Sequence, residues 1–453
     1  MLDKTKLSKW ELDNYDKILE IEANMTTEKD KDFIEKFFED MWEHFDYKVE
    51  TRPVIILSTP SKTGTDWFRL RVPLYDLWKR FGDKYYFIFT DKFNVNMIKF
   101  ADLIIQHRAG EMHLWQNKIE TMWPKGNFKK PVICHDVDDN EFNLPDSHPL
   151  KQMWIATGKD KMSMSQLLQA HQISTTGRTL KTMFSKFGAF NKIDVLPNAF
   201  QWKQKQWKEL SWEDKEKTKP ELGLGKVTVG WAGLTSHFPD LTKMLSIFKK
   251  AQKHSDDLYF ILSGMPTNDQ VNLPDADGNM VSTQTPQEHT YKYKILHGFK
   301  YDEKNKFEGY VPALGKDNVI GQDVKDLHNY GEFYDQYDIN VAYLAEKSSF
   351  NKAKSPIKVI EGFRKKAVCV WTQWGGYQDF WYNLPPNLKK IATAHMACDS
   401  DKKMAENITF WAKNPEYRKE VAELFFNYVT EEFGIETVNN KRIQLYEKLL
   451  KEK

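Results

Sequence analysis

Residues 337–370, YDINVAYLAEKSSFNKAKSPIKVIEGFRKKAVCV, contain two short apolar runs with a helix-forming run between them. The runs at 337–344 and 367–371 have the length and the apolar content of buried strands. Between them, the spacing of apolar residues from Pro356 to about Lys365 is typical of a helix. A strand, a helix and a strand in this order predict a βαβ unit of a parallel sheet.

The same alternation continues on both sides of this unit. Further strand-like runs lie at 54–59, 85–91, 101–108, 131–139, 171–176, 193–200, 226–233 and 258–264. A polar, Lys-rich stretch that ends in Pro and Gly divides these runs into two series. We therefore predict an α/β protein of two Rossmann-like domains, each a doubly wound parallel sheet, facing each other across a cleft.

The predicted domain boundaries follow changes in composition. The polar, helix-prone N-terminal stretch is expected to form an added helical layer, and the last stretch is mostly amphipathic helix. The expected parts are an N-terminal helical extension at 1–50, a first Rossmann-like domain at 51–205, a linker at 206–225, a second Rossmann-like domain at 226–405 and C-terminal helices at 406–453. Residues 266–325 are polar and rich in Gly, Asp and Asn, so we expect an insertion there.

Composition excludes several classes of protein. The 453 residues carry 66 Lys and Arg against 64 Asp and Glu, a net charge of +2, so no global field attracts nucleic acid or an anionic membrane. Three cysteines without metal-like spacing argue against a disulfide framework and a cysteine zinc site. No apolar run approaches the ~18 residues that span a bilayer, and the N-terminus lacks an apolar signal region. We expect a cytoplasmic protein.

The most informative polar residues lie at the start of the helix in the quoted stretch. Ser355 followed by Pro356 predicts a helix start, with Ser as the N-cap. The amides of this first turn, with Lys354 and Lys358 nearby, form a candidate phosphate site. Glu361 lies near the same helical face and is placed to accept hydrogen bonds from ribose hydroxyls. The alternative is a capped helix with solvated lysines and a surface glutamate.

A second candidate turn lies at 230–241, GWAGLTSHFPDL, where a predicted strand ends and a helix begins. The amides from Gly233 to Ser236, together with the His237 imidazole, would complete a diphosphate cradle from the opposite side. A Gly-containing turn between a strand and a helix is weak evidence by itself. Two such helix starts in one domain make a stronger case.

A third candidate lies in the first domain at 61–71, SKTGTDWFRLR. Gly64 permits a tight backbone turn before a helix, and Thr65 and Arg69 follow it as candidate contacts to a ligand. The alternative is an ordinary connection between a strand and a helix.

The fourth candidate is the cluster HDVDD at 135–139, which ends a predicted strand. His135, Asp136, Asp138 and Asp139 are candidates to bind acceptor hydroxyls, to orient a catalytic group or to hold a divalent metal. Asp-rich turns also occur as simple helix caps. Because Asp-x-Asp is a common pattern, we do not favour the metal.

Three of these segments resemble the GT-B glycosyltransferases, and within them the retaining nucleotide-sugar enzymes of family 4, including versions found in bacteriophage genomes. The similar segments are DVLPNAF at 194–200, GWAGLTSHFPDL at 230–241 and the stretch 337–370. The resemblance covers roughly residues 52–400. It implies that the first domain binds the acceptor and the second domain binds the donor.

The resemblance also implies roles for the candidate residues. Glu361 would bind the donor ribose, the amides around Ser355 to Ile357 would bind the pyrophosphate, and His135 would lie near the transferred sugar. We expect the catalytic residues to be His135, Asp138 and Lys358. The expected donor-binding residues are Gly233, Ser236, His237, Lys354, Ser355, Pro356, Ile357 and Glu361. The expected acceptor-binding residues are Gly64, Thr65, Arg69, Asp136 and Asp139.

One position departs from the family pattern. The family signature has two Glu separated by seven residues, and Ala353 stands where the first would precede Glu361. The missing carboxylate normally contacts hydroxyls of the donor sugar. Asn351 and Glu346 are candidates to replace it.

The implied activity is hexosyltransferase-like transfer from a UDP- or GDP-sugar, with retention at the anomeric carbon. No metal or cofactor is required if protein cations stabilise the leaving diphosphate. The acceptor is either a glycan or surface saccharide, or a hydroxymethylated base of viral DNA, in which case the protein acts in the host cytoplasm. For DNA, the linker QWKQKQWK at 201–208 would supply phosphate contacts and base stacking, and 266–325 would act as a wedge.

Two alternatives to a transferase stay open. One is a non-catalytic GT-B scaffold that binds DNA or glycan. The absence of the first Glu of the family signature is consistent with this alternative. The other is a sugar-nucleotide epimerase of the same architecture, which would need no acceptor.

Overall fold

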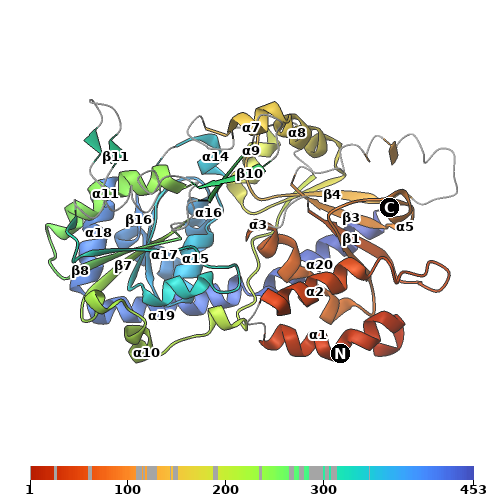
Figure 1. The fold of residues 1–453 in the computed structure, drawn as a ribbon, viewed down its shortest axis with the longest axis horizontal. Helices are drawn as coiled ribbons and strands as arrows, with labels where there is room; N and C mark the ends of the chain where they lie inside the picture. Colours follow the sequence, from red (N-terminus) through yellow and green to blue (C-terminus); the bar gives the residue numbers. More distant parts are fainter. Residues whose placement is uncertain are drawn as a thin grey trace. The chain divides into compact units, whose positions relative to one another are not determined.

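The computed structural model divides the chain into two compact units (Figure 1). Unit 1 comprises Met1–Lys208, Ser348–Ser355 and Thr430–Lys453, and unit 2 comprises Glu209–Lys347 and Pro356–Val429. The structure describes residues 2–24, 28–59, 64–108, 115, 118–119, 130–142, 144–145, 151–186, 192–233, 237–264, 270–274, 280–284, 299–300, 306–307, 314–345 and 347–452.

Unit 1 is built on six parallel strands. They are β1 (Val54–Ser58), β2 (Tyr86–Thr90), β3 (Leu103–His107), β4 (Val132–Val137), β5 (Gln172–Thr175) and β6 (Ile193–Val195). Their order in the sheet is β2-β1-β3-β4-β5-β6. Strands β1, β2 and β3 are buried along their whole length, as expected for parallel strands covered on both faces. The first predicted parallel sheet is therefore confirmed.

The helices of unit 1 come from three separate parts of the sequence. They are α1 (Lys9–Asn24), α2 (Glu28–Asp40), α3 (Gly64–Asp66), α4 (Val72–Phe81), α5 (Val95–Phe100), α7 (Lys151–Ala156), α8 (Lys159–Gln169), α9 (Arg178–Ser185), α14 (Ser349–Lys352) and α20 (Ile435–Lys451). A π-helical turn, Trp67–Arg71, joins α3 to α4. Pro73 follows this π-helical turn within one continuous helical stretch, where the proline cannot donate the backbone hydrogen bond that another residue would make.

Buried polar contacts hold the N- and C-terminal helices to unit 1. Glu11 of α1 is buried and accepts hydrogen bonds from Arg52 Nη2 at 2.7 Å and from Trp78 Nε1 at 2.9 Å. Asn439 of α20 donates to Pro73 O and to Asp76 Oδ2, both at 2.9 Å. Because each of these groups is buried, losing one partner would leave an unsatisfied polar atom, and the contacts therefore specify where the helices pack.

Unit 2 also has six parallel strands. They are β7 (Val227–Ala232), β8 (Leu258–Ser263), β13 (Val319–Gln322), β14 (Ile339–Ala342), β15 (Val368–Thr372) and β16 (Ala397–Cys398). Their order is β13-β8-β7-β14-β15-β16. Counted along the unit this is 3-2-1-4-5-6, the order of the dinucleotide-binding Rossmann sheet. Such a sheet binds its ligand where the strand order reverses, which here is at the carboxyl ends of β7 and β14.

The helices of unit 2 follow the strands in the predicted alternation. They are α10 (Trp212–Lys217), α11 (Phe238–Gln252), α15 (Ile357–Arg364), α16 (Gly376–Asn383), α17 (Pro386–His395), α18 (Asp401–Lys413) and α19 (Pro415–Glu432). Within the segment 266–325, β9 (Gln270–Pro274) pairs antiparallel with β10 (Met280–Gln284), and β11 (Phe299–Lys300) pairs with β12 (Lys306–Phe307). The same segment ends in β13, the edge strand of the main sheet.

The three cysteines lie in the strands as buried free thiols. Cys134 is in β4, Cys369 in β15 and Cys398 in β16. Burial raises the pKa of the Cys134 and Cys398 thiols to about 12, so neither is ionised at neutral pH. Among the helices that the structure describes, none is long and apolar enough to cross a membrane.

Candidate functional site

In unit 2 the carboxyl end of β7 meets the first turn of α15. A Cβ added to Gly233 would lie 2.7 Å from the Trp231 ring and 2.9 Å from Lys358 Nζ, so a larger residue would force one of these side chains to move. Lys358 Nζ lies 4.8 Å from the centroid of the Trp231 ring, a distance at which a cation is attracted to the ring face. The structure thus brings together two segments that the sequence predicted as parts of one phosphate site.

Helix α15 begins one residue later than predicted. Pro356 is its N-cap, and a first backbone bond runs from Val359 N to Pro356 O at 3.0 Å. Ser355, which was expected to cap the helix, lies before it, and its hydroxyl accepts a hydrogen bond from Asn198 Nδ2 at 3.1 Å. Because the first amides of a helix have no acceptor within the helix, the turn at Ile357 keeps the character of an anion site.

Glu361 is buried against two tyrosines of the 3-10 helix Tyr330–Gln336. One carboxylate oxygen accepts a hydrogen bond from Tyr330 Oη, and the other accepts one from Tyr334 Oη at 2.6 Å. Burial raises the pKa of Glu361 to about 7, although the hydrogen bonds from the tyrosines and the charge of Lys358 act in the opposite direction. With 2% of its surface exposed, Glu361 is not the surface glutamate of the alternative interpretation.

His237 stands at the start of α11, as its N-cap residue. Its Nδ1 lies 3.0 Å from Asp240 Oδ2, and Asp240 Oδ1 accepts a hydrogen bond from Ala345 N at 2.7 Å. Asp240 therefore links the imidazole to the segment that follows β14. Of the predicted residues in this region, Ser236 and Glu346 lie outside the described residues.

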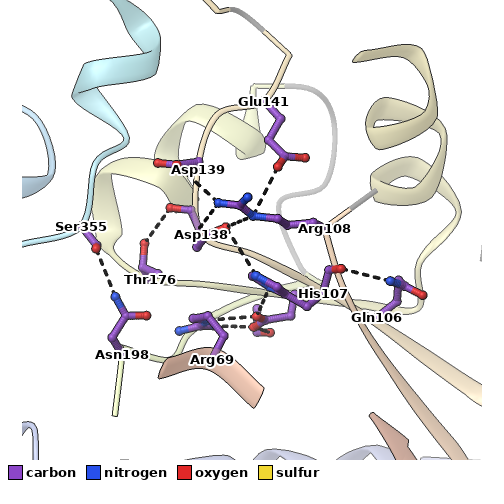
Figure 2. Close-up of polar contacts among 12 residues, drawn as sticks. Arg69, Gln106, His107, Arg108, Asp138, Asp139, Glu141, Thr176, Asn198 and Ser355 are labelled. Carbon is purple, nitrogen blue, oxygen red and sulfur yellow. Dashed lines mark hydrogen bonds and ion pairs between the residues drawn. The ribbon is translucent and has the colours of Figure 1, made fainter. Parts of the chain in front are cut away.

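The carboxyl end of the unit 1 sheet holds a buried network around Asp136, and Figure 2 labels Arg69 and His107 of this network. Arg69 from the π-helical turn forms a two-bond ion pair with the Asp136 carboxylate, with Nε at 2.9 Å, and it also donates to Leu196 O. His107 Nδ1 lies 2.9 Å from the same carboxylate, and the Ser174 hydroxyl donates to it. Burial by itself raises the pKa of Asp136, but Arg69 and His107 outweigh burial and hold it well below its usual range.

A second group of charges surrounds Arg108, which follows β3 in a left-handed conformation with φ of 58°. Its guanidinium lies 2.9 Å from Asp138, 3.4 Å from Glu141 and 3.6 Å from Asp139, as Figure 2 shows. Asp139 also pairs with Lys354 Nζ at 3.0 Å. Burial raises the pKa of Asp138, but the charge of Arg108 outweighs it and the net pKa falls to about 2. Asp138 is therefore ionised and paired with Arg108, whereas burial raises the pKa of Glu141 although the charge of Arg108 acts in the opposite direction.

His135 lies within β4 itself, whereas Asp138 and Asp139 follow the strand. Its side chain is 1% exposed, and Nδ1 lies 3.2 Å from Gln106 O. Burial lowers the pKa of His135 to about 4, so the ring is neutral at physiological pH.

The remaining predicted contacts of unit 1 are Gly64 and Thr65, which open α3 and are half-buried. Residues 60–63, before this turn, lie outside the described part of the chain. Asp66, the last residue of α3, pairs with Arg71 at 2.7 Å, which ties α3 to the π-helical turn. Asn351, a candidate to replace the missing glutamate, is half-buried in α14.

The sequence interpretation missed several residues of these networks, among them His107, Arg108, Tyr330 and Tyr334. His107 and Arg108 end the run ADLIIQHR at 101–108, and polar residues at the end of a predicted parallel strand are a usable signal. Tyr330 and Tyr334 lie four residues apart just before β14, and nothing local distinguishes them from core aromatics. Within the described part of the chain, no group of three or more His, Cys, Asp and Glu residues is arranged to hold a metal ion.

No protein-family model matches the sequence, and no curated protein matches it. Solved structures do match the fold. Anabaena HepE in complex with UDP aligns with a TM-score of 0.56 at 11% identity, over 87% of this chain and 100% of the other. Sucrose-phosphate synthase of Thermosynechococcus elongatus aligns with a TM-score of 0.56 at 11% identity, over 89% of this chain and 100% of the other. A glycosyltransferase from Rickettsia africae gives 0.55 at 13% identity, over 89% and 100%.

At these identities the likeness shows the fold alone. The two six-stranded parallel sheets match those of GT-B glycosyltransferases, so the predicted fold class is confirmed.

Proposed function

We propose that the chain is a glycosyltransferase that moves a sugar from a nucleotide sugar to an acceptor hydroxyl. The observation that carries this proposal is the meeting of Gly233, Lys358 and the amide end of α15 where the strand order of unit 2 reverses. Doubly wound sheets bind nucleotides at this point. A small residue, a cation and helix-start amides are the groups that hold a diphosphate.

The structural neighbours support a uridine nucleotide. HepE has been solved with UDP and, in a further structure that aligns with a TM-score of 0.51, with UDP and glucose. We propose a UDP-hexose as the donor, with a GDP-sugar as the alternative, and the unit 2 residues as its binding site.

Each donor-site residue has a role in this proposal. Lys358 and the amides near Ile357 neutralise the diphosphate, whose charge grows as the bond to the sugar breaks. His237 approaches the diphosphate from the other helix start. Glu361 accepts hydrogen bonds from the ribose hydroxyls, because each carboxylate oxygen keeps a second lone pair beside its tyrosine.

Transfer with retention follows from the resemblance to the family 4 enzymes, including their bacteriophage versions. In this scheme protein cations take the place of a metal at the leaving group. Ala353, which replaces the first glutamate of the family signature, is 2% exposed and packs in the core of unit 1. The contact to the donor sugar must therefore come from another residue, and Asn351 is the described candidate.

The acceptor side is proposed on unit 1, with His135 and Asp138 near the reacting sugar. Gly64 and Thr65 are candidates for direct contact, whereas the Asp139 carboxylate is paired with Lys354 and Arg108. The side chains of Arg69 and Asp136 have no exposed surface in the structure. We therefore propose that their ion pair supports the acceptor-binding residues without contacting the acceptor.

The structure bears on the DNA acceptor through the tryptophans of 201–208. Trp207 is fully buried, and Trp202 stacks on Phe200 with ring centroids 4.6 Å apart. The Trp207 ring is therefore closed to bases, and Trp202 is half-buried, so this stretch leaves at most part of one ring for base stacking. We therefore propose a saccharide acceptor. A gel shift against duplex DNA over a salt series tests the alternative, and binding that weakens steeply with salt would restore it.

The test of the proposed function begins with thermal-shift measurements on UDP, GDP and their sugars. We expect a UDP-sugar to raise the melting temperature, because a ligand of the native state stabilises it. Transfer to saccharide acceptors, with the anomeric configuration of the product read by NMR, then tests retention.

Three other outcomes would each replace the proposal. Nucleotide binding without hydrolysis or transfer would indicate a non-catalytic scaffold. Interconversion of donor sugars without an acceptor would indicate an epimerase. If no nucleotide or nucleotide sugar shifts the melting temperature and none is turned over, the assignment fails.

A further inference from the structure

Residues 348–355, which we call the strap, belong to unit 1 although β14 and α15 on either side belong to unit 2. The strap leaves β14 of unit 2, forms the short helix α14, and returns to unit 2 at Pro356. Its Ala353 packs in a core cluster of unit 1 with Val137, Leu167, Ala170, Ile173, Leu180, Phe184 and Ile193. The chain that leads into the proposed diphosphate site is therefore folded as part of the other unit.

Two polar contacts at the end of the strap add to this apolar anchor. Lys354 Nζ pairs with Asp139 Oδ2 at 3.0 Å, and Asn198 Nδ2 donates to Ser355 Oγ at 3.1 Å, the latter drawn in Figure 2. The side chains of Lys354 and Asp139 are 21% and 12% exposed, so the pair is shielded from water more than a surface pair is. Lys354 Nζ also lies 4.1 Å from the centroid of the Phe350 ring within the strap.

We propose that Asp139 and Asn198 are positioning residues for the donor, acting through the strap on the backbone that enters α15. The inference rests on the proposed function. It assigns to Asp139 an effect on the donor, although the sequence placed that residue on the acceptor side. Lys354, expected to bind the donor directly, acts here mainly by holding its own backbone in place.

The physical reason is the entropy of the residues from Lys354 to Ile357. Held by Asp139 and Asn198, their backbone presents its amides in one arrangement before the diphosphate arrives. Released from these anchors, the same residues must be ordered on binding, and fixing one residue costs about 1–2 kcal/mol. Such a loss weakens ground-state and transition-state binding alike, so it raises KM and leaves kcat nearly unchanged.

The test compares donor kinetics of Asp139→Asn, Lys354→Met and the double variant. We expect each single variant to raise the KM for the donor about tenfold, with kcat within about twofold and an unchanged KM for the acceptor. The double variant should match the single variants rather than multiply them, because both remove one contact. Lys354→Arg should stay near wild type. Asn198→Ala should give a smaller increase in the same direction.

Matched controls are Asp91→Asn and Lys161→Met, which remove the same charges at exposed positions of unit 1. A donor KM unchanged in Asp139→Asn, a KM effect confined to the acceptor, or multiplicative effects in the double variant would overturn the inference.

Hydrogen exchange separates this inference from the proposed function. Without any ligand, the peptide covering 348–357 should exchange faster in Asp139→Asn and in Asn198→Ala than in wild type and the controls. Normal exchange in both variants would refute the anchoring whatever the activity. Faster exchange in a protein that neither binds nor turns over nucleotide sugars would refute the proposed function, and the donor role of the strap with it.

Discussion

The two sheets of this protein have the same architecture, yet the residues at their carboxyl ends differ in kind. In unit 1 the edge is a closed network of opposite charges, in which Arg69, His107 and Asp136 are buried together. In unit 2 the edge is made of Gly233 and Lys358 beside an aromatic ring, with a carboxyl group held by two tyrosines.

The difference is between a sheet edge that is held rigid by paired charges and one that can bind a ligand. A buried network of paired charges has satisfied its own partners and resists change, because breaking one pair leaves an uncompensated charge. A lysine near a glycine and a helix start concentrates positive potential where an anion can be received. We infer that unit 1 mainly holds shape at its carboxyl edge and that unit 2 mainly binds.

The largest effect is expected where the unit 1 network is broken. Arg69→Met leaves the Asp136 carboxylate buried without its cation and should lower the free energy of unfolding by about 3–5 kcal/mol. Urea denaturation of the full-length variant and of wild type measures this difference in the free energy of unfolding. Lys36→Met, which breaks an exposed pair with Asp40 in α2, is the control and should cost less than about 1 kcal/mol. Equal losses in the two variants would show that the buried network is not what holds unit 1.

Removing the positive charge of Lys358 in unit 2 should lower the rate of turnover without reducing the stability of the fold. Lys358→Ala is expected to lower kcat/KM by about 10²–10³, the usual loss when one group that stabilises developing charge is deleted. The melting temperature should change little. Lys390→Ala, an exposed lysine of α17, is the control. Near-normal transfer by Lys358→Ala would remove this residue from the mechanism.

The raised pKa of Glu361 predicts that the stability of unit 2 depends on pH. Because folding raises this pKa from 4.5 to about 7, the protonated form is favoured in the folded state, so this residue's contribution to stability is present below pH 4.5 and is lost as pH rises towards 7. The loss is on the order of 3–4 kcal/mol. Glu361→Gln should flatten this part of the stability profile between pH 5 and 8.

Donor binding should follow the opposite trend, because a ribose hydroxyl donates best to the ionised carboxylate. We expect the KM for the donor to fall about fivefold to tenfold between pH 6 and pH 8. Tyr334→Phe removes a hydrogen bond that lowers the pKa, so the profile should move to higher pH. A KM profile that is unchanged in Tyr334→Phe would contradict the role of this tyrosine.

The smallest effect tests the close approach at Gly233. In Gly233→Ala the new methyl group meets the Trp231 ring and displaces Lys358, and the donor KM should rise about tenfold at a stability cost of about 1–2 kcal/mol. Gly321→Ala is matched, because a Cβ there meets no heavy atom within 4 Å. If both variants bind the donor like wild type, the geometry around Gly233 is not limiting.

Local patterns were sufficient to predict most of the fold. The apolar runs predicted the strands of both sheets except β13 and β16, and the helix after Ser355 was predicted to within one residue of its start. The strand β13 near the end of segment 266–325 was not predicted, because it has only four residues and its apolar residues show no clear periodicity.

The candidate site could be predicted only in part. The sequence pointed to Gly233 and Lys358, and the structure places them in contact. The sequence did not reveal that Glu361 is buried between tyrosines, because these tyrosines lie in the 3-10 helix Tyr330–Gln336, some thirty residues away in the chain. His107 was missed because its importance comes from Asp136, which is on another strand.

The sequence by itself determined the alternation of strands and helices, because the period of apolar residues is a local property that each segment carries alone. Only the tertiary structure decided which charges meet. Arg69 and Asp136 are 67 residues apart, and Lys354 and Asp139 are 215 residues apart. Such pairs form only when the sheet orders its strands and the strap packs into unit 1, and no local pattern encodes either event.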